Sequence, residues 1–292
     1  MSRTVYVNGE YIDETNASLS IFDRGLLFAD SVYEVSSVLQ GKLIDNAAHL
    51  ARLQRSLAAL NMALPVSLEA LQQIQTRLVQ ANQLQEGIVY IQVTRGASAE
   101  RSFAIPSDIS ASLIVFTQAA NLTHSSLAER GIKVITVEDI RWQRRDIKTT
   151  MLLPASLAKQ QAINAGADDA WLVSGGYVNE GSANNAFIIT QENSLVTRPL
   201  DQQILHGITR AAVLQLAQEQ ALTLEERAFT VQEAYQAKEA FSTGASAFVL
   251  PVVAIDGHVL SDGKPGVLTR RLRQLYMQQA LNLEYLAYFE EN

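Results

Sequence analysis

Short apolar runs alternate with stretches whose apolar residues recur at helical spacing, a pattern that indicates a mixed α/β protein. Residues 5–7 and 11–12 flank Asn8-Gly9, a pair that supplies the positive φ angles of a tight hairpin. Five leucines, beginning with Leu50 and ending with Leu64, predict one buried helix face, and Asn46 is the expected N-cap. The same reading predicts a helix over residues 67–83 and buried strands over residues 88–93 and 112–117.

The second half of the chain repeats this alternation after a polar segment of small residues near position 120. We therefore expect an N-terminal α/β domain over residues 1–120, a linker region over 121–130 and a C-terminal domain over 131–292. The strands expected there are 132–137, 170–173, 186–189 and a run around 247–253, and the expected helices are 154–165, 209–220, 231–238 and 266–283.

Composition narrows the classes of function. The formal net charge of −7 disfavours a nucleic-acid surface, so a small-molecule ligand is expected. The absence of cysteine excludes disulfides, thiolate metal sites and cysteine nucleophiles, and the four histidines show no metal-ligand spacing. The first residues lead straight into a strand, and no apolar run approaches the length of a membrane span. We expect a soluble cytoplasmic protein without a metal, a membrane segment or a nucleic-acid partner.

Lys148 is a candidate nucleophile because of its neighbours. It ends a run that contains Arg141, Arg144 and Arg145, and nearby guanidinium charge favours the neutral amine that Schiff-base chemistry needs. Charge runs are more often solvated surfaces, and most lysines lie at the surface. The local pattern alone leaves both interpretations open.

Small and hydroxyl residues gather at residues 180–185, 206–210 and 242–246. The second group places Gly207 and a Thr209 N-cap at the start of a predicted helix, where backbone N–H groups favour an anion such as phosphate. The third group could form an anion-binding nest, and Arg52 could reach a phosphate or face solvent. An ordinary capped helix, a plain turn and a solvated arginine are the competing interpretations. The sequence has no Rossmann, Walker A or nucleophile-elbow motif.

Taken in order, several stretches resemble the signature segments of D-amino acid aminotransferases and their fold-type IV relatives, which depend on pyridoxal phosphate. The resemblance covers nearly the whole chain and is collinear. The matching stretches are residues 20–35, 49–53, 93–96, 139–148, 178–182, 205–210 and 251–252, with 262–266 after them.

The resemblance implies roles for particular residues. Lys148 matches the lysine that binds the cofactor as a Schiff base and moves the proton at the substrate's α-carbon. Glu180 matches the carboxylate that keeps the pyridine nitrogen protonated, so that the ring can act as an electron sink. Leu205 matches the residue packed on the ring, and Tyr33 matches an aromatic residue of the substrate pocket. The residues that match the phosphate cradle are Arg52, Ile208, Thr209 and Ala245.

The same resemblance implies two α/β domains with the cofactor in the cleft between them, and a homodimer whose partner loop closes the pocket. The implied reaction has two half-reactions. An amino donor passes its amino group to the cofactor, and a 2-oxo acid such as pyruvate or 2-oxoglutarate then takes it. The implied donor is a D-amino acid similar to D-alanine.

The pattern for carboxylate recognition departs from that of the D-amino acid enzymes. Those enzymes carry an Arg-x-His pair, and the matching positions here are Arg101 and Phe103. Arg101 could still clamp a carboxylate, whereas Phe103 adds apolar surface. Ala29 and Ser31 also stand where glycine is usual. An (R)-selective amine transaminase with relaxed carboxylate recognition is therefore the main alternative.

Three further alternatives remain at this level. An aminodeoxychorismate lyase shares the lysine and the fold, and a branched-chain aminotransferase takes L-substrates. The Tyr33-Glu34-Val35 run and residues 205–210 are more similar to the D-amino acid branch. A catalytically silent scaffold of the same fold would have no reason to keep Lys148 together with Glu180.

Overall fold

A computed structural model of the chain describes residues 2–281, and these residues form two compact units. The first unit contains the chain up to Asn121 together with Ile147–Met151. The second contains Leu122–Asp146 and the chain from Leu152 onward. The expected domains were continuous in sequence, and the structure differs in returning residues 147–151 to the first unit. Backbone hydrogen bonds to a strand of that unit hold them there, a pairing that no local pattern reveals.

The first unit is built on an antiparallel six-stranded sheet of order β2-β1-β6-β5-β3-β4. The predicted hairpin at Asn8-Gly9 is confirmed, because both residues have positive φ and β1 pairs with β2. The strand β3, which carries Tyr33, is not among the strands expected from the sequence. The strands are β1 (Thr4–Val7), β2 (Glu10–Asp13), β3 (Ser31–Leu39), β4 (Lys42–Leu43), β5 (Glu86–Thr94) and β6 (Ser112–Ala119).

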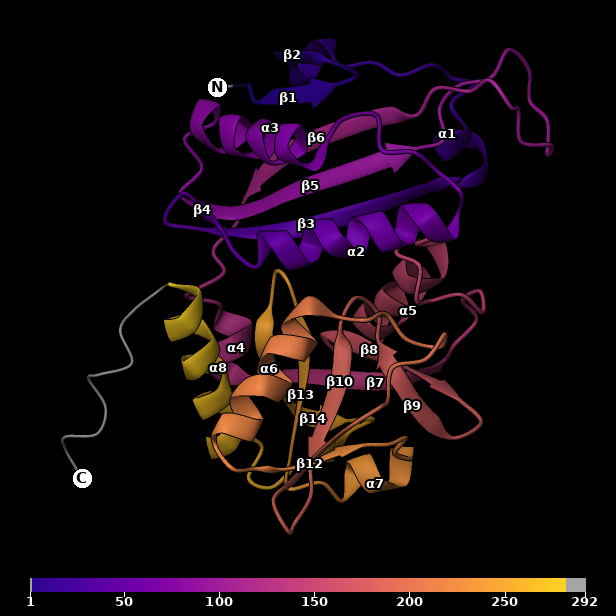
Figure 1. The fold of residues 1–292 in the computed structure, drawn as a ribbon. Helices are drawn as coiled ribbons and strands as arrows, with labels where there is room; N and C mark the ends of the chain where they lie inside the picture. The colour runs from indigo at the N-terminus through magenta and orange to yellow at the C-terminus, as the bar shows by residue number, and fades with distance from the viewer. Residues whose placement is uncertain (1, 282–292) are drawn as a thin grey trace. The chain divides into compact units, whose positions relative to one another are not determined.

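Helices α2 (Asn46–Ala59) and α3 (Leu68–Ala81) lie on the same face of this sheet (Figure 1). Leucines of α2 are buried as the helical spacing predicts, but the helix ends before Leu64 because the chain turns at Asn61, whose φ is positive. The expected N-cap is also wrong. Asp45 occupies that position, and the Asn46 side chain bonds Ser36 and Gln75 instead. The 3-10 turn Glu14–Asn16 and α1 (Arg24–Phe28) complete the unit.

The described part of the second unit contains a nine-stranded mixed sheet. The strand β7 runs parallel to both β8 and β14, and β10, β11 and β14 are buried along their whole length. Burial on both faces explains why they read as continuous apolar runs. The strands are β7 (Ile132–Glu138), β8 (Asp169–Ser174), β9 (Tyr177–Gly181), β10 (Asn185–Ile189), β11 (Ser194–Thr197), β12 (Thr223–Glu226), β13 (Glu239–Gly244), β14 (Phe248–Ile255) and β15 (His258–Val259).

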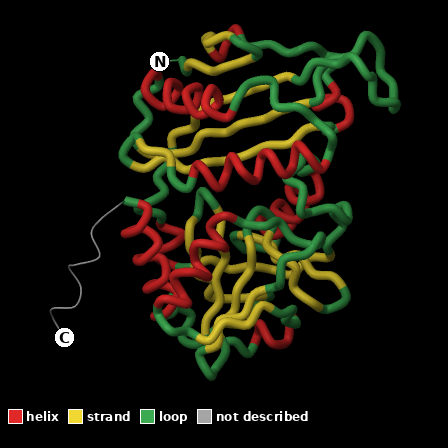
Figure 2. Tube along the Cα trace, viewed as in Figure 1, coloured by secondary structure: helices red, strands yellow, loops and turns green. Residues whose placement is uncertain are grey.

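Helices of the second unit pack against this sheet (Figure 2). The region expected to be a linker contains a short helix, α4 (Ser126–Arg130). The predicted C-terminal helix is α8, and its expected end at residue 283 lies outside the described residues. The other helices and α8 span Leu153–Asn164 (α5), Ile208–Glu219 (α6), Val231–Tyr235 (α7) and Val267–Ala280 (α8). Over residues 2–281, no helix combines the length and apolar character that a membrane span requires.

Candidate active site

Lys148 lies on a short extended segment that pairs with β3 in the first unit. Its carbonyl accepts a hydrogen bond from the Tyr33 backbone at 3.0 Å, and its own N–H donates to the Ser56 hydroxyl at 3.2 Å. The Lys148 ammonium nitrogen then lies 4.1 Å from the centre of the Tyr33 ring. The structure thus brings together two predicted site residues that lie far apart in the sequence.

A buried carboxylate, Glu34, organises the neighbouring charges. Arg52 donates to both of its oxygens, at 2.7 and 2.9 Å, and His49 Nδ1 lies 2.9 Å from one of them. Burial alone would raise the pKa of Glu34, but the charge and hydrogen bonds of Arg52, with help from His49 and Lys148, lower it to about 2. Arg52 is therefore a buried, oriented cation rather than a solvated one.

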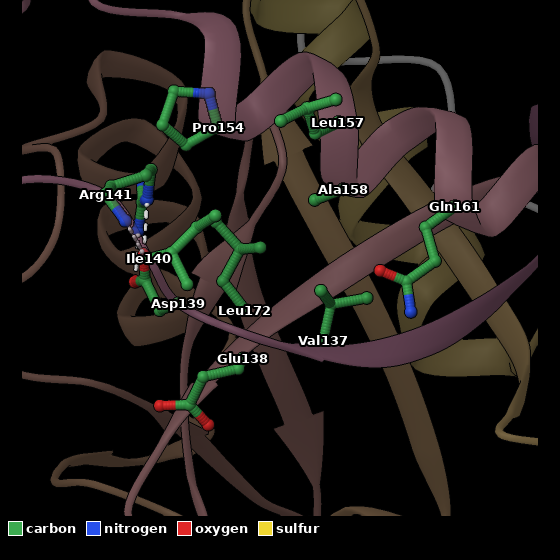
Figure 3. A pocket seen from close by; sticks show the side chains of 10 residues that line it. All are labelled: Val137, Glu138, Asp139, Ile140, Arg141, Pro154, Leu157, Ala158, Gln161 and Leu172. Carbon is green, nitrogen blue, oxygen red and sulfur yellow. Dashed lines mark hydrogen bonds and ion pairs between the residues drawn. The ribbon is translucent and has the colours of Figure 1, made fainter.

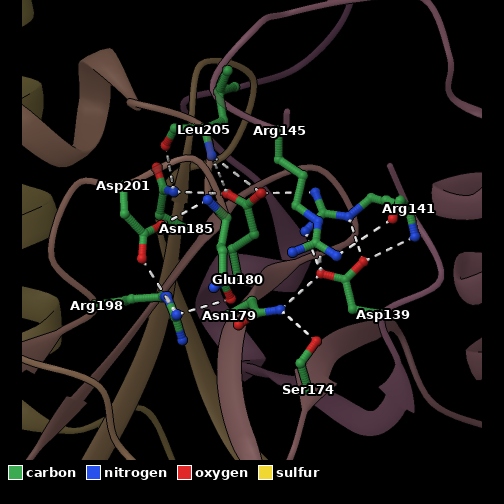
Figure 4. Close-up of polar contacts among 11 residues, drawn as sticks. Asp139, Arg141, Arg145, Ser174, Asn179, Glu180, Asn185, Arg198, Asp201 and Leu205 are labelled. Carbon is green, nitrogen blue, oxygen red and sulfur yellow. Dashed lines mark hydrogen bonds and ion pairs between the residues drawn. The ribbon is translucent and has the colours of Figure 1, made fainter. Parts of the chain in front are cut away.

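Glu180, on β9, is one of the buried carboxylates of the second unit. It accepts hydrogen bonds from Arg141 Nη1 at 2.7 Å, from the Asn185 amide at 2.9 Å and from the Leu205 backbone at 3.1–3.2 Å (Figure 4). Burial raises the pKa of Glu180, and Arg141 opposes that shift most strongly. Glu180 therefore presents acceptor oxygens, and Arg141 favours their ionised form.

Arg141 is itself held by a second carboxylate, Asp139. The Arg141 Nε and Nη2 atoms donate to the two Asp139 oxygens at 2.9 and 2.8 Å. The amide of Asn179 donates to Asp139 at 2.9 Å, and Arg145 Nε lies 3.4 Å from the same carboxylate. From the sequence, Arg141 was expected only as a charge near Lys148, and no role was expected for Asn185 or Asp139, although residues 139–148 lie in a matching stretch. In the structure, Arg141 and Asn185 stand out because they donate to Glu180, and Asp139 stands out because it holds Arg141.

The N-terminus of α6 presents backbone N–H groups from Ile208 and Thr209. Gly207 is its N-cap, so the expected Thr209 cap is wrong, and Thr209 is the second helical residue. Gly207 carries no side chain that could cap these groups. A Cβ atom there would lie 2.0 Å from Asn185 Oδ1, so close packing also requires glycine at this position. Ala245 follows the end of β13, beside Thr243, whose buried hydroxyl has no hydrogen-bond partner.

Arg101 and Phe103 lie in the loop between β5 and β6 of the first unit. The Arg101 guanidinium lies 5.0 Å from the Phe28 ring centre and 5.1 Å from that of Phe103. Arg24 ties this loop to α1 by donating to the backbone carbonyls of Ser102 and Ala104. Phe103 is 79% exposed, so it offers an apolar surface rather than a packed core side chain.

A small pocket in the second unit opens between β7 and α5, and none of the predicted site residues lines it (Figure 3). Its walls are mainly apolar, with Asp139 and Arg141 at one end. This hollow is therefore not the predicted cofactor site. The predicted residues form two sets instead, one in each unit. Tyr33, Arg52, Arg101, Phe103 and Lys148 belong to the first, and Glu180, Leu205, Ile208, Thr209 and Ala245 to the second.

Comparison with known proteins identifies the family. The model for "Amino-transferase class IV" matches residues 31–255. The D-alanine aminotransferase of Staphylococcus aureus (strain MSSA476) is 36% identical over 271 residues, covering 92% of this chain and 95% of that protein. The D-alanine aminotransferase of Bacillus licheniformis is 36% identical over 278 residues, covering 95% and 97%.

The fold comparison agrees with the sequence comparison. The branched-chain aminotransferase from the archaeon Thermoproteus uzoniensis, solved with norvaline, superposes with a TM-score of 0.86. It is 27% identical and covers 98% of this chain and 97% of that one. The fold-type IV prediction is thereby confirmed. The chain belongs to amino-transferase class IV and is an aminotransferase.

Proposed function

We propose that the protein transfers an amino group from a D-amino acid, such as D-alanine, to a 2-oxo acid, such as pyruvate or 2-oxoglutarate, with pyridoxal phosphate as cofactor. The Lys148 ammonium over the Tyr33 ring is the observation that carries this proposal, because an amine held beside an aromatic wall suits a nucleophile that meets an amino-acid substrate. The 36% sequence identity to D-alanine aminotransferases, which extends over more than nine-tenths of the chain, supports a donor of D-configuration.

The residues fit the cofactor in three respects. Glu180 offers acceptor oxygens to a protonated ring nitrogen, because its three neighbours are all donors. In the second unit, the α6 N-terminus offers backbone N–H groups that suit a phosphate, and in the first unit Arg52 offers a buried positive charge that suits the same kind of group. The unpartnered Thr243 hydroxyl beside the Ala245 turn suits the same anion. Leu205 contributes an apolar side chain near Glu180, suited to packing against a flat ring.

When bound, pyridoxal phosphate supplies an aldehyde that condenses with amines and a ring that draws electrons away from the substrate's α-carbon. Lys148 would hold the cofactor through its amine and would move the proton at the substrate's α-carbon. Tyr33 orients the lysine and faces the substrate. Arg101 attracts the substrate carboxylate through its permanent charge.

We also propose that the protein is a homodimer. Large apolar side chains are exposed around α1 and on the β5–β6 loop, which Arg24 ties together. Ile21 and Leu26 are each 70% exposed, and Phe103 is 79% exposed. Apolar side chains gathered on connected segments mark an interaction surface. A second copy that covers them would also bring its own Arg101 loop to the interface.

An (R)-selective amine transaminase remains a second candidate because Phe103 supplies apolar surface where a carboxylate-binding donor is expected. The visible spectrum of the purified protein distinguishes the candidates when D-alanine, L-alanine, L-leucine and (R)-1-phenylethylamine are added separately. Loss of the cofactor's visible band with D-alanine and not with the L-amino acids is the expected result. A response to the amine measures how relaxed the pocket is. A response to L-leucine alone would support a branched-chain L-aminotransferase, and a colourless protein after cofactor is supplied would support a silent scaffold.

A further inference from the structure

Arg141 connects two carboxylates in the interior of the second unit. It donates one hydrogen bond to Glu180 and two to Asp139, so every branch of its guanidinium group is oriented. Its side chain is 14% exposed and that of Glu180 is 3% exposed. A charge-assisted hydrogen bond of 2.7 Å in such a buried setting strongly stabilises the ionised form of the carboxylate. Arg141 is therefore placed to control the charge of Glu180.

The charged groups that act on Glu180 are Arg141, Asp139 and Arg145. Burial and the negative charge of Asp139 favour the protonated acid, whereas the two arginines favour the carboxylate. Arg141 is the only one of the three that an observed hydrogen bond joins to Glu180 among the described residues. Without it, the buried carboxyl group would compete for any proton that a ligand brings.

We propose that Arg141 is a positioning residue that keeps Glu180 ionised, and thereby keeps the proton on the ring nitrogen of bound pyridoxal phosphate. The inference rests on the proposed function, in which Glu180 meets that nitrogen. A proton shared by two groups moves towards the one farther from a fixed positive charge. Arg141 touches Glu180 directly, so its charge drives the proton from the carboxyl group to the ring.

Asp139 and Asn179 support this role by fixing Arg141. Two hydrogen bonds from Arg141 and one from Asn179 satisfy the Asp139 carboxylate, which therefore holds the guanidinium in one orientation. The fixed orientation matters because a rotated guanidinium would leave Glu180 with only the neutral donors of Asn185 and Leu205. Neutral donors favour the carboxylate less than a full positive charge does.

The test is the nitrogen-15 NMR signal of the ring in protein loaded with pyridoxal phosphate labelled at that nitrogen. Wild type, Arg141→Gln, Arg141→Lys and Arg144→Gln are compared at neutral pH. Arg144 is the matched control, since it lies in the same loop and its ion pair is with Asp146. In Arg141→Gln, the ratio of protonated to unprotonated ring should fall about tenfold or more, because losing an adjacent opposite charge shifts a carboxyl pKa by about 1–3 units. Arg141→Lys should keep the ring protonated, because a positive charge remains.

An unchanged, protonated ring in loaded Arg141→Gln overturns the inference, and so does an equal change in Arg144→Gln. If Arg141→Gln does not fold or loses its cofactor, Arg141→Lys carries the test, and an unprotonated ring there overturns the inference. A wild-type protein that takes up no pyridoxal phosphate overturns the proposed function, and this inference with it. A loaded wild type with a normal response to D-alanine leaves the proposed function standing whatever the Arg141 variants show.

Discussion

The ammonium nitrogen of Lys148 lies 4.1 Å from the centre of the Tyr33 ring, over its face. The backbones of the two residues are also hydrogen-bonded, so the side chains share one anchoring point. An ammonium over an aromatic face gains about 0.5–2 kcal/mol, depending on desolvation. Tyr33 therefore orients the Lys148 ammonium group.

Two substitutions of Tyr33 distinguish the contribution of its aromatic ring from that of its hydroxyl group. Tyr33→Phe keeps the aromatic face and should retain most of kcat/KM for D-alanine. Tyr33→Leu removes the face, and the lost attraction predicts a fall of about two- to thirtyfold. Steady-state kinetics of both variants decide the matter. Equal losses in the two variants would show that the hydroxyl group, and not the ring face, is what matters.

Lys148→Ala should remove the visible band of the cofactor and lower transamination by about a thousandfold or more, because positioned proton transfer and covalent binding are both lost. Absorbance and the covalent trapping of cofactor by borohydride measure the two effects. Lys159→Ala is the control, since Lys159, on α5, pairs with Asp169 and is not one of the predicted site residues. Normal turnover in Lys148→Ala, or equal damage in Lys159→Ala, would contradict the assignment.

Gly207→Ala should weaken cofactor binding through Asn185. The new Cβ would lie 2.0 Å from Asn185 Oδ1, and the same amide donates to Glu180 and to the Leu205 carbonyl. The backbone at Gly207 has φ −66°, so the clash and not backbone strain is the cause. Titration of the apoprotein with pyridoxal phosphate gives the affinity. If Gly207→Ala weakens cofactor binding by displacing Asn185, then adding Gly207→Ala to Asn185→Ala should lower the cofactor affinity little further. Additive losses would contradict that route.

Local sequence patterns predicted the elements whose causes are local. The Asn8-Gly9 hairpin depends on two adjacent residues, and the buried face of α2 depends on leucines within one helix. The end of α2 was missed because Asn61 reverses the chain while the apolar spacing continues to Leu64. Elements fixed by a local pattern are therefore predictable in type, although their ends are not.

The candidate site was predicted by resemblance more than by pattern, because its contacts are distant in sequence. Arg141 and Glu180 are joined across 39 positions, and Glu34 meets Arg52 across 18. Neither pair has a spacing that a single helix or hairpin would impose. The ionised state of Glu34 depends on burial and on partners that only the folded chain supplies. Sequence motifs located these regions, whereas the charge networks required the structure.

Glu34→Gln should destabilise the protein and change how its stability depends on pH. Removing one partner of a buried ion pair costs about 3–5 kcal/mol, because Arg52 would keep a buried charge with weaker compensation. The folded pKa of Glu34, about 2, is below the ordinary value of 4.5. Its ionisation therefore stabilises the native state fully above the ordinary pKa, and this contribution is lost as the pH falls towards 2.

Urea unfolding of wild type and Glu34→Gln across this pH range measures both effects. The difference in unfolding free energy should be largest at neutral pH and shrink under acid conditions. Glu14→Gln is the control, because Glu14 pairs with Arg3 at the surface, and it should change stability little. A stability gap between wild type and Glu34→Gln that stays constant from neutral pH to about pH 3 would contradict the proposed ionisation.

If the proposed function holds, we expect Arg101 to distinguish a D-amino acid from a simple amine as donor. Its guanidinium lies near the faces of the Phe28 and Phe103 rings, which hold the cation while leaving its charge available to a substrate. Arg101→Ala should lower kcat/KM for D-alanine by about ten- to a hundredfold, the equivalent of one charge-assisted hydrogen bond of about 1.5–3 kcal/mol. The same change should leave (R)-1-phenylethylamine nearly unaffected, because that donor has no carboxylate. Arg101→Lys, which keeps the charge, should fall between wild type and Arg101→Ala with D-alanine. Equal losses for both donors would show that Arg101 holds the loop rather than the carboxylate, and Phe103→His would then be the variant to examine for a gain with D-alanine.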